Sequence, residues 1–340
     1  MFSILIPTWN NLPFLKLCVE SIRRHSSFDH EILVHVNDGS DGTREWVQSQ
    51  GLRHTRSTGN IGICFALNQV SRLATRDWLL YLNDDMVCTP GWDTALLAAT
   101  SQLATPLCFL SSLVIEPNEG TNANVLFRDF GTGPESFDEA GLLAYAASLH
   151  EADRDGVASQ PTLVRRELWH LVGGYSIEFG PGMSSDDDFL MKLWIAGCRN
   201  FRIVGGSLIY HFACRSTGRV RRNRGHREFL MKWGITWREF QRDYLRRSAS
   251  VPADPLPAVP TPSLHGRMKR VFHGAKGFPL EDLRAWDENP SRHLVLDGNL
   301  LPNGPMVEKV LTSPLHRNQA GSEEAPPINT SPTDQAGPKT

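Results

Sequence analysis

The chain has 340 residues, of which 40% are hydrophobic, and a formal net charge of -2. This length allows one large domain with an appendage or two modest domains, and the composition is that of a globular protein. The nearly balanced charge gives no overall signal for binding nucleic acid or another polyanion. The six cysteines are scattered and form no Cys-x-x-Cys pair, which favours buried free thiols in a reducing compartment.

No apolar segment reaches the roughly 20 residues that a membrane span requires. The N-terminal apolar run is short, lacks a basic leader and is broken by Pro7, so we expect neither a signal peptide nor an anchor. The sequence therefore predicts a cytoplasmic protein that could at most lie against the inner face of a membrane.

Short apolar runs alternate with segments of helical periodicity over the first ninety residues. Strands are predicted at residues 2–7, 31–36, 52–57 and 78–82, and helices at 15–22, 43–50 and 63–74. Because short loops join these elements, the strands should be parallel, with right-handed crossovers. The predicted fold class is α/β, with a Rossmann-like, doubly wound and mostly parallel sheet.

The pattern loosens into a predicted α+β segment beyond residue 91. Predicted elements are a helix through Leu96 and Leu97, a strand at 108–115, a loop at 118–133, a helix at 137–151, an extended piece at 162–164, a helix at 167–172, a helix from Asp186 to Gly197, and a strand at 201–212. The last strand carries His211 at its end. A histidine in that position could be a metal ligand or a structural residue.

Residues 215–247 are strongly basic, with eleven Arg or Lys against three acids. Their aromatic residues recur at steps of three and four, which predicts one amphipathic helix. Its aromatic stripe could pack on the preceding domain, or the helix could rest on anionic lipid. We predict a catalytic domain over 1–247, a Pro-rich linker over 248–262 and a poorly structured tail over 263–340.

Three polar residues, Asn83, Asp84 and Asp85, follow the apolar strand at 78–82 directly. Ligands of open α/β sheets bind beyond the carboxyl ends of strands, and two adjacent carboxylates are costly to desolvate without a cation. Hard oxygen ligands suit Mg²⁺ or Mn²⁺, which could bridge nucleotide phosphates. The alternative interpretation is a solvated turn with two surface acids.

Neither G-x-G-x-x-G after the first strand nor a P-loop motif occurs in the chain, which disfavours dinucleotide and P-loop sites. The motifs present are PTWN at 7–10, EILVHVNDGSDGTREWV at 31–47, NIG at 60–62 with Asn68, and NDD at 83–85. In this order and spacing they resemble the inverting family 2 glycosyltransferases of the GT-A fold, over roughly residues 2–215.

The resemblance implies a role for each matching residue. It places Pro7, Thr8, Asn10, Asp38, Asn68, Asn83 and Asp84 at the nucleotide-sugar site, and Asp85 and His211 at the metal. Asp38 would bind the base, and Asp84 would contact ribose or metal-bound water. Three positions depart from the family pattern, namely Asn37, Leu67 and Asn83.

Gly173-Gly174-Tyr175, followed by residues 185–189 and Gly197, resembles the acceptor-side segment of that family. Its register selects Asp186 as the catalytic base, with Asp187 and Asp188 as fallback candidates. Successive helical residues point about 100° apart, so the three carboxylates cannot share one direction.

The resemblance thus implies a hexosyltransferase-like enzyme that moves a sugar, with inversion, from a nucleotide sugar such as a UDP-sugar to a hydroxyl acceptor. The acceptor would be a glycan or lipid-linked glycan, the cofactor Mn²⁺ or Mg²⁺, and peripheral membrane contact is possible. The alternatives are a catalytically silent nucleotide-sugar binder or scaffold, and a sugar-nucleotide pyrophosphorylase.

Overall fold

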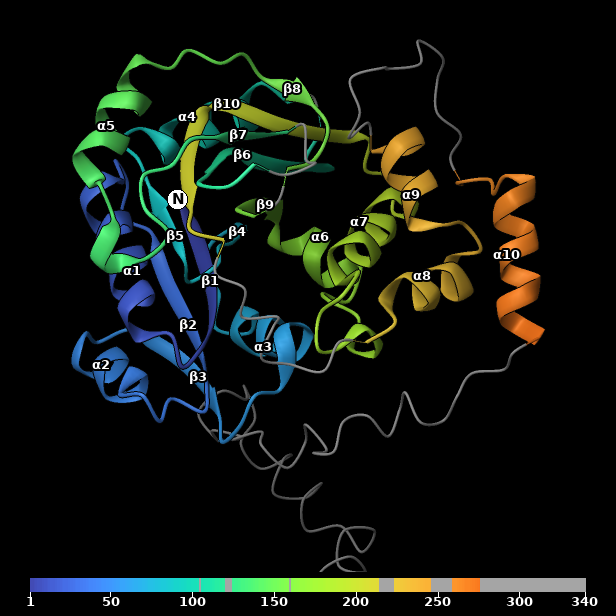
Figure 1. Ribbon diagram of the computed structural model, residues 1–340, viewed down its shortest axis with the longest axis horizontal. Helices are drawn as coiled ribbons and strands as arrows, with labels where there is room; N and C mark the ends of the chain where they lie inside the picture. Colours follow the sequence, from blue (N-terminus) through green and yellow to red (C-terminus); the bar gives the residue numbers. More distant parts are fainter. Residues whose placement is uncertain (104, 120–123, 159, 214–222, 246–258, 276–340) are drawn as a thin grey trace, which may run out of the picture. The chain divides into compact units, whose positions relative to one another are not determined.

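A ten-stranded mixed sheet forms the centre of the protein in a computed structural model (Figure 1). The structure describes residues 1–103, 105–119, 124–158, 160–213, 223–245 and 259–275. The main strand order is β3-β2-β1-β4-β9-β6-β10-β5, with β7 beside β6 and β8 beside β10. The strands are β1 (Phe2–Trp9), β2 (Glu31–Asn37), β3 (Arg53–Ser57), β4 (Trp78–Tyr81), β5 (Met86–Cys88), β6 (Cys108–Glu116), β7 (Val125–Phe127), β8 (Arg154–Asp155), β9 (Thr162–Arg165) and β10 (Asn200–His211).

Helices cover both faces of this sheet, as the predicted doubly wound architecture requires. They are α1 (Leu12–His25), α2 (Thr43–Ser49), α3 (Gly62–Ser71), α4 (Trp92–Ser101), α5 (Glu139–Ser148), α6 (Arg166–Leu171), α7 (Ser185–Ile195), α8 (Gly225–Trp233), α9 (Trp237–Glu239) and α10 (Leu264–Ala275). Side chains of β1 alternate between the faces. Phe2, Ile4 and Ile6 join the core cluster that contains the apolar residues of α1 and α4, whereas α3 packs on β1 and β2 from the other face (Figure 1).

The four N-terminal strands β1 to β4 are parallel, as the alternation of strands and helices predicted. The α+β character of the second half is also confirmed, because β9 runs antiparallel to both β4 and β6. Within the region predicted as loop, β7 adds a short parallel strand to β6. No described helix is long and apolar enough to cross a membrane.

The prediction of one helix over 215–247 is wrong within the described residues. Helix α8 ends at Gly234, which has a φ of 76° and serves as its C-cap. Thr236 and Glu239 then form a capping box that starts α9, and a π-helical turn, η4 (Phe240–Tyr244), follows. The packing interpretation of the aromatic stripe is confirmed, since the rings of Phe240 and Tyr244 contact Trp194 of α7.

The predicted tail also needs correction at its start. Residues 264–275 form helix α10, which packs against α8. This packing is fixed by hydrogen bonds from the Ser263 amide to Glu239 and from the Arg227 guanidinium to the His273 carbonyl. The remainder of the predicted linker and tail, residues 248–258 and 276–340, lies outside the described part of the chain.

Candidate active site

Seven strands, namely β1, β2, β3, β4, β6, β7 and β10, have their carboxyl ends at one edge of the sheet. Because β9 is antiparallel to both β4 and β6, and β6 is parallel to β10, strands β6 and β10 point the same way as β1, β2 and β4. Ligand sites of open α/β sheets lie beyond such carboxyl ends. The four non-glycine residues of the described chain with positive φ, Asn10, Asp38, Ser184 and Ala213, all adjoin elements of this edge. Such backbone strain clusters at functional sites.

The ends of β1 and β2 are tied together through Asn10 and Asp38. The Asn10 amide donates to the Asp38 carboxylate over 2.8 Å and accepts from the Gly39 amide over 2.9 Å. Pro7 and Thr8 are buried just before this contact, and the Thr8 hydroxyl has no hydrogen-bond partner among the described residues. Buried hydroxyls are normally satisfied, so the Thr8 hydroxyl indicates a place for a ligand or a water molecule.

Two asparagines of the resembling motifs hold the backbone in place. Asn37 donates to the Thr8 carbonyl and accepts from the Ile61 amide, and so joins β1 to the start of α3. A carboxylate at this position could accept from Ile61 but could not donate to Thr8. Asn68 donates to the Tyr175 carbonyl over 2.7 Å and accepts from the Tyr175 amide over 2.9 Å. One N–H and one lone pair of Asn68 are thus used on Tyr175, and the predicted contact of Asn68 with a nucleotide sugar stays a prediction.

Asn83, Asp84 and Asp85 follow β4, and the antiparallel pair β5–β10 brings His211 beside the last of them. His211 Nε2 lies 3.3 Å from Asp85 Oδ1, and His211 Nδ1 lies 2.8 Å from Glu116 Oε1 at the end of β6. Burial acts against the charged imidazole, but the hydrogen bonds and charges of Asp85 and Glu116 outweigh it and raise the pKa of His211 to about 9. The ring is therefore a cation at neutral pH unless another cation replaces its proton.

The pair Asp85 and His211 fits a divalent cation. Two neighbouring ligands, each about 2.1 Å from an octahedral ion, lie roughly 3 Å apart, close to the spacing of this carboxylate oxygen and ring nitrogen. Glu116 would hold the other ring nitrogen, the usual outer partner of a ligating histidine. No group of three or more His, Cys, Asp or Glu that could hold a metal occurs within the described residues. An ion here would need further oxygen ligands from phosphate or water.

Asp186 lies in the first turn of α7 and accepts a hydrogen bond from the Tyr175 hydroxyl over 2.8 Å. The Tyr175 ring is 3% exposed, and it stacks on Phe189 and contacts Tyr81 edge-on. Burial and then the charge of Asp186 raise the pKa of Tyr175 well above its ordinary value, so the phenol keeps its proton and donates.

Tyr81, the last residue of β4, connects this carboxylate with the strand-end acids. Burial raises the pKa of Tyr81 well above its ordinary value, and the charges of Asp186, Asp84 and Asp85 act in the same direction. The Tyr81 ring also contacts Tyr175, whose hydroxyl donates to Asp186. Tyr175 and Tyr81 therefore link Asp186 to the end of β4, which Asp84 and Asp85 follow.

The two fallback carboxylates serve structural contacts. Asp187 accepts from Gln241 over 2.6 Å. Asp188 is fully buried and lies 2.8 Å from both the Trp233 ring nitrogen and the Lys232 ammonium. These contacts fasten α7 to α8 and η4, so Asp186 is the member of the triplet that faces the strand ends.

Two residues of the site, Glu116 and Tyr175, were not among the sequence-predicted candidates. Glu116 ends an apolar run whose position in the sheet was not known from the sequence. Tyr175 is part of the recognised Gly173-Gly174-Tyr175 motif, and its position in that motif could have identified it as a candidate site residue.

Comparison with known sequences identifies relatives for part of the chain. The model of the family described as "Glycosyl transferase family 2" matches residues 3–137. PGL/p-HBAD biosynthesis glycosyltransferases of Mycobacterium bovis (strain BCG / Pasteur 1173P2) and Mycobacterium tuberculosis (strain ATCC 25618 / H37Rv) are 29% identical over 187 residues. The match covers 53% of this chain and 64% of each relative, so the chain spans less than two thirds of their length.

Comparison with solved structures supports the fold. The crystal structure of GalNAc-T7 with UDP, GalNAc and Mn2+ is similar with a TM-score of 0.51 and 14% identity, over 84% of this chain and 57% of that one. TarS of S. aureus is similar with a TM-score of 0.47 and 15% identity, over 62% and 60% of the two chains. The likeness to GalNAc-T7 shows a common fold and confirms the expected GT-A architecture.

Proposed function

We propose that the chain is a member of glycosyl transferase family 2, whose model matches residues 3–137, and that it transfers a sugar from a nucleotide sugar, such as a UDP-sugar, to a hydroxyl acceptor with inversion. The proposal rests above all on one observation. The Tyr175 hydroxyl that donates to Asp186 belongs to a ring that contacts Tyr81 edge-on at the end of β4, and the same strand end leads directly to Asp85, which pairs with His211.

The donor side is formed by the ends of β1, β2 and β4. We assign Pro7, Thr8 and the Asn10–Asp38 pair to the nucleotide, because Thr8 presents a buried hydroxyl that no described residue bonds and Asp38 is held in place by Asn10. Asn83 and Asp84 stand next to Asp85 and are assigned to the ribose and the diphosphate side. Asn68 holds the Tyr175 backbone and keeps one N–H and one lone pair that could reach the donor.

Asp85 and His211 would hold Mn²⁺ or Mg²⁺, with Glu116 fixing the imidazole. A bound dication would neutralise the charge that develops on the diphosphate leaving group. Binding requires His211 to give up its proton, and the Glu116 carboxylate keeps the ring oriented once the proton is gone. Support for a metal also comes from GalNAc-T7, whose crystal structure contains Mn2+.

Asp186 would take the proton of the acceptor hydroxyl as that oxygen attacks the sugar. A general base must lie within hydrogen-bond reach of the proton and keep a fixed orientation. Tyr175 donates to Asp186 Oδ1 and leaves Oδ2 to accept from the acceptor. Asp187 and Asp188 are committed to contacts with Gln241, Lys232 and Trp233, which makes them poorer candidates for this role.

We further propose that the acceptor is a glycan or lipid-linked glycan and that the enzyme contacts a membrane peripherally. The mycobacterial relatives are glycosyltransferases of PGL/p-HBAD biosynthesis, which supports a biosynthetic role.

Release of UDP from a panel of UDP-sugars, measured with Mn²⁺ and again in excess EDTA, tests the proposal. We expect turnover with at least one donor, loss of turnover in EDTA and its return with added Mn²⁺. Asp85→Ala should abolish turnover at every Mn²⁺ concentration. Full turnover after metal stripping would refute the metal assignment, and nucleotide binding without turnover of any donor would favour the silent-binder alternative.

A further inference from the structure

Helix α10 has two faces of opposite character. On its inner face Gly266 is buried, and a Cβ atom there would lie 2.8 Å from a Glu239 carboxylate oxygen. On the opposite face Leu264, Met268 and Val271 are 75%, 64% and 73% exposed. These three residues are spaced by four and three, so they form one stripe along the helix.

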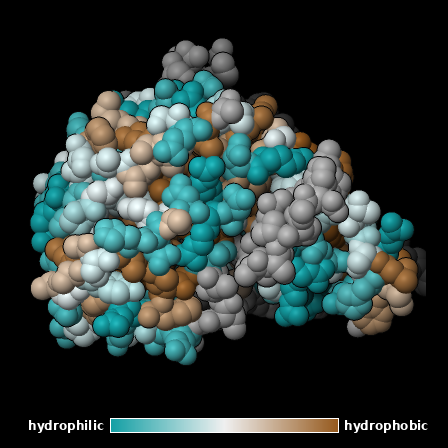
Figure 2. All heavy atoms as spheres, turned by 90° about the horizontal axis from the view of Figure 1, so that it is seen from above, coloured by the Kyte–Doolittle hydropathy of each residue, from teal (hydrophilic) through white to brown (hydrophobic). Residues whose placement is uncertain are grey.

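This stripe is unusual on the described surface. Ten large hydrophobic residues are exposed there, and four of them, including Phe272, belong to the twelve residues of α10. Figure 2 shows hydrophobic side chains next to hydrophilic ones at the right-hand edge, the side on which α10 lies in Figure 1. A helix that turns its apolar stripe away from the core is typical of a helix that binds an apolar partner.

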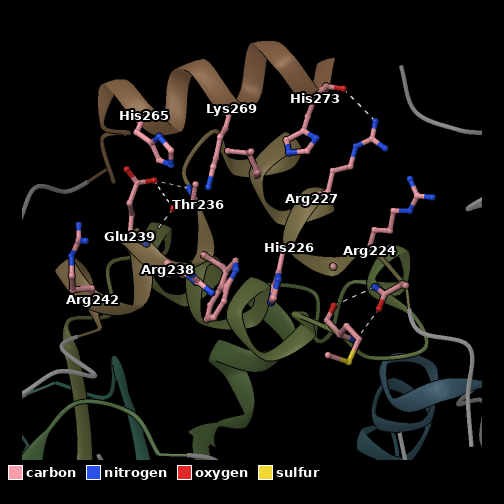
Figure 3. Close-up of a pocket in the computed structure, with 15 residues that line it drawn as sticks. Arg224, His226, Arg227, Thr236, Arg238, Glu239, Arg242, His265, Lys269 and His273 are labelled. Carbon is pink, nitrogen blue, oxygen red and sulfur yellow. Dashed lines mark hydrogen bonds between the residues drawn. The ribbon is translucent and has the colours of Figure 1, made fainter. Parts of the chain in front are cut away.

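The charge of α10 restricts that partner. The helix carries Arg267, Lys269 and Arg270 and no acidic residue, and none of these three cations pairs with a carboxylate in the described part of the chain. A cleft of about 700 Å³ lies between α10 and the α8–α9 region. His265, Lys269 and His273 point into it from α10 and face Arg227 and Arg238 (Figure 3).

The occupant must therefore combine an apolar layer with negative charge. An anionic lipid surface does so, since acyl chains accept the stripe while phosphates meet the flanking cations. A second copy of α10 is a poorer partner, because it would bring two sets of cations together. Twelve helical residues span about 18 Å, too short for the roughly 30 Å hydrocarbon layer, so α10 would lie in the interface.

We propose that α10 is a membrane-docking helix that seats this protein on an anionic phospholipid surface. It replaces the 215–247 segment as the lipid-binding element, because that aromatic stripe is buried against α7. Helix α10 packs on α8, and α8 begins at Gly225, which lies against the carbonyl of Met183. Met183 is three residues before Asp186, so the lipid surface would lie on the acceptor side of the site. The docking helix specifies the peripheral membrane contact proposed above, and its placement near an acceptor rests on the proposed function.

Flotation of the full chain with vesicles tests the proposal. One vesicle set is phosphatidylcholine alone, and the other contains phosphatidylcholine and phosphatidylglycerol. We expect tight binding to the anionic set, and a partition coefficient lower by roughly tenfold or more on the neutral set, since each cation near an anionic surface contributes about fivefold.

Matched variants locate the contact. Met268→Gln with Val271→Gln should reduce binding to anionic vesicles on the order of tenfold. Leu171→Gln, at a residue that is 74% exposed on α6, is the control and should bind as the parent does. Arg267→Gln, at a cation that is next to the stripe and does not line the cleft, should reduce binding roughly fivefold, whereas the exposed Arg72→Gln should not. Circular dichroism and thermal unfolding would verify that each variant is folded.

Three results would overturn the proposal. The first is that the parent chain floats with neither vesicle set, and the second is that the α10 variants bind vesicles as the parent does. The third is that the parent forms a dimer and binds no vesicles, and that the α10 variants are monomers. The last result would identify a second copy as the occupant. Vesicle binding needs no sugar donor, so failure of glycosyl transfer would leave the docking result intact, and the converse also holds.

Discussion

Replacing Tyr175 by phenylalanine would remove one hydroxyl from the centre of the proposed site. The ring is 3% exposed and stacks on Phe189 at a centroid distance of 4.9 Å, so the smaller side chain keeps its packing. The change therefore deletes the 2.8 Å hydrogen bond to Asp186 and little else. The variant therefore tests how much the orientation of Asp186 matters for the rate, while the stability of the fold stays nearly unchanged.

The size of the effect follows from that bond. A hydrogen bond to a charged group contributes about 1.5–3 kcal/mol. If all of this energy served to orient the carboxylate, its loss would slow the reaction by roughly tenfold to a hundredfold. We expect kcat of Tyr175→Phe to fall by about tenfold while UDP affinity stays at the parent value, because no donor-side residue is changed.

The assay is steady-state UDP release at saturating donor, combined with calorimetric titration of UDP. Tyr244→Phe is the matched control, since its hydroxyl accepts from the Thr261 amide over 2.9 Å and has no contact with Asp186. This control should change stability and leave kcat unaltered. An unaltered kcat in Tyr175→Phe, or a parallel loss of UDP affinity, would refute the assignment of Tyr175 as the positioning residue of the base.

Other predictions concern the frame around the site. Burial lowers the pKa of His35 from 6.5 to about 3, so below pH 6.5 the unfolded chain binds a proton at His35 and the folded chain does not. The free energy of unfolding should therefore decrease as the pH is lowered from 6.5 towards 3. In urea unfolding, the plot of this free energy against pH should be less steep for His35→Gln by up to about 1.4 kcal/mol per pH unit. Asp188→Ala should lower the free energy of unfolding by about 1–3 kcal/mol, because it removes the acceptor of the Trp233 ring N–H and one of the two carboxylates beside Lys232, and UDP affinity should not change. Deletion of residues 276–340 should leave turnover and thermal midpoint close to the parent values, whereas a chain ending at 250 should unfold at lower temperature, since it loses α10 and its contacts with Glu239.

The N-terminal half of the fold was predictable because its sequence pattern is local and regular. Each strand from β1 to β4 is a short apolar run, and each intervening helix has a periodic apolar stripe, so alternation alone indicates parallel pairing. The position of β9 between β4 and β6 was not predictable. It depends on antiparallel pairing between segments far apart in the sequence.

The C-terminal region shows why periodicity misled. Aromatic residues at steps of three and four predicted one long helix, yet Gly234 and the Thr236–Glu239 capping box carried the signal for a break. Helix α10 was missed because it is short and contains two glycines, which lower its helical propensity. Its stability comes from contacts with α8 and Glu239, which no local pattern encodes.

Some residues of the site could be predicted from the sequence and others could not. Residue types at strand ends and the order of motifs indicated Asp85, His211 and Asp186, and the structure brings these three residues to one edge of the sheet. The partners that orient them, Glu116 and Tyr175, depend on the strand register and on the packing of α3 against the 175 region. The sequence alone contains neither of these.

The separation of donor binding from proton transfer is the central claim, and one variant tests it most directly. Asp186→Asn keeps the size and the hydrogen bond of the side chain but removes its basicity. With Mn²⁺ present, this variant should bind UDP with the parent's affinity and should transfer sugar in a single turnover at least about a hundredfold more slowly. Parent-like transfer by Asp186→Asn, together with loss of transfer in Asp187→Asn, would contradict the account.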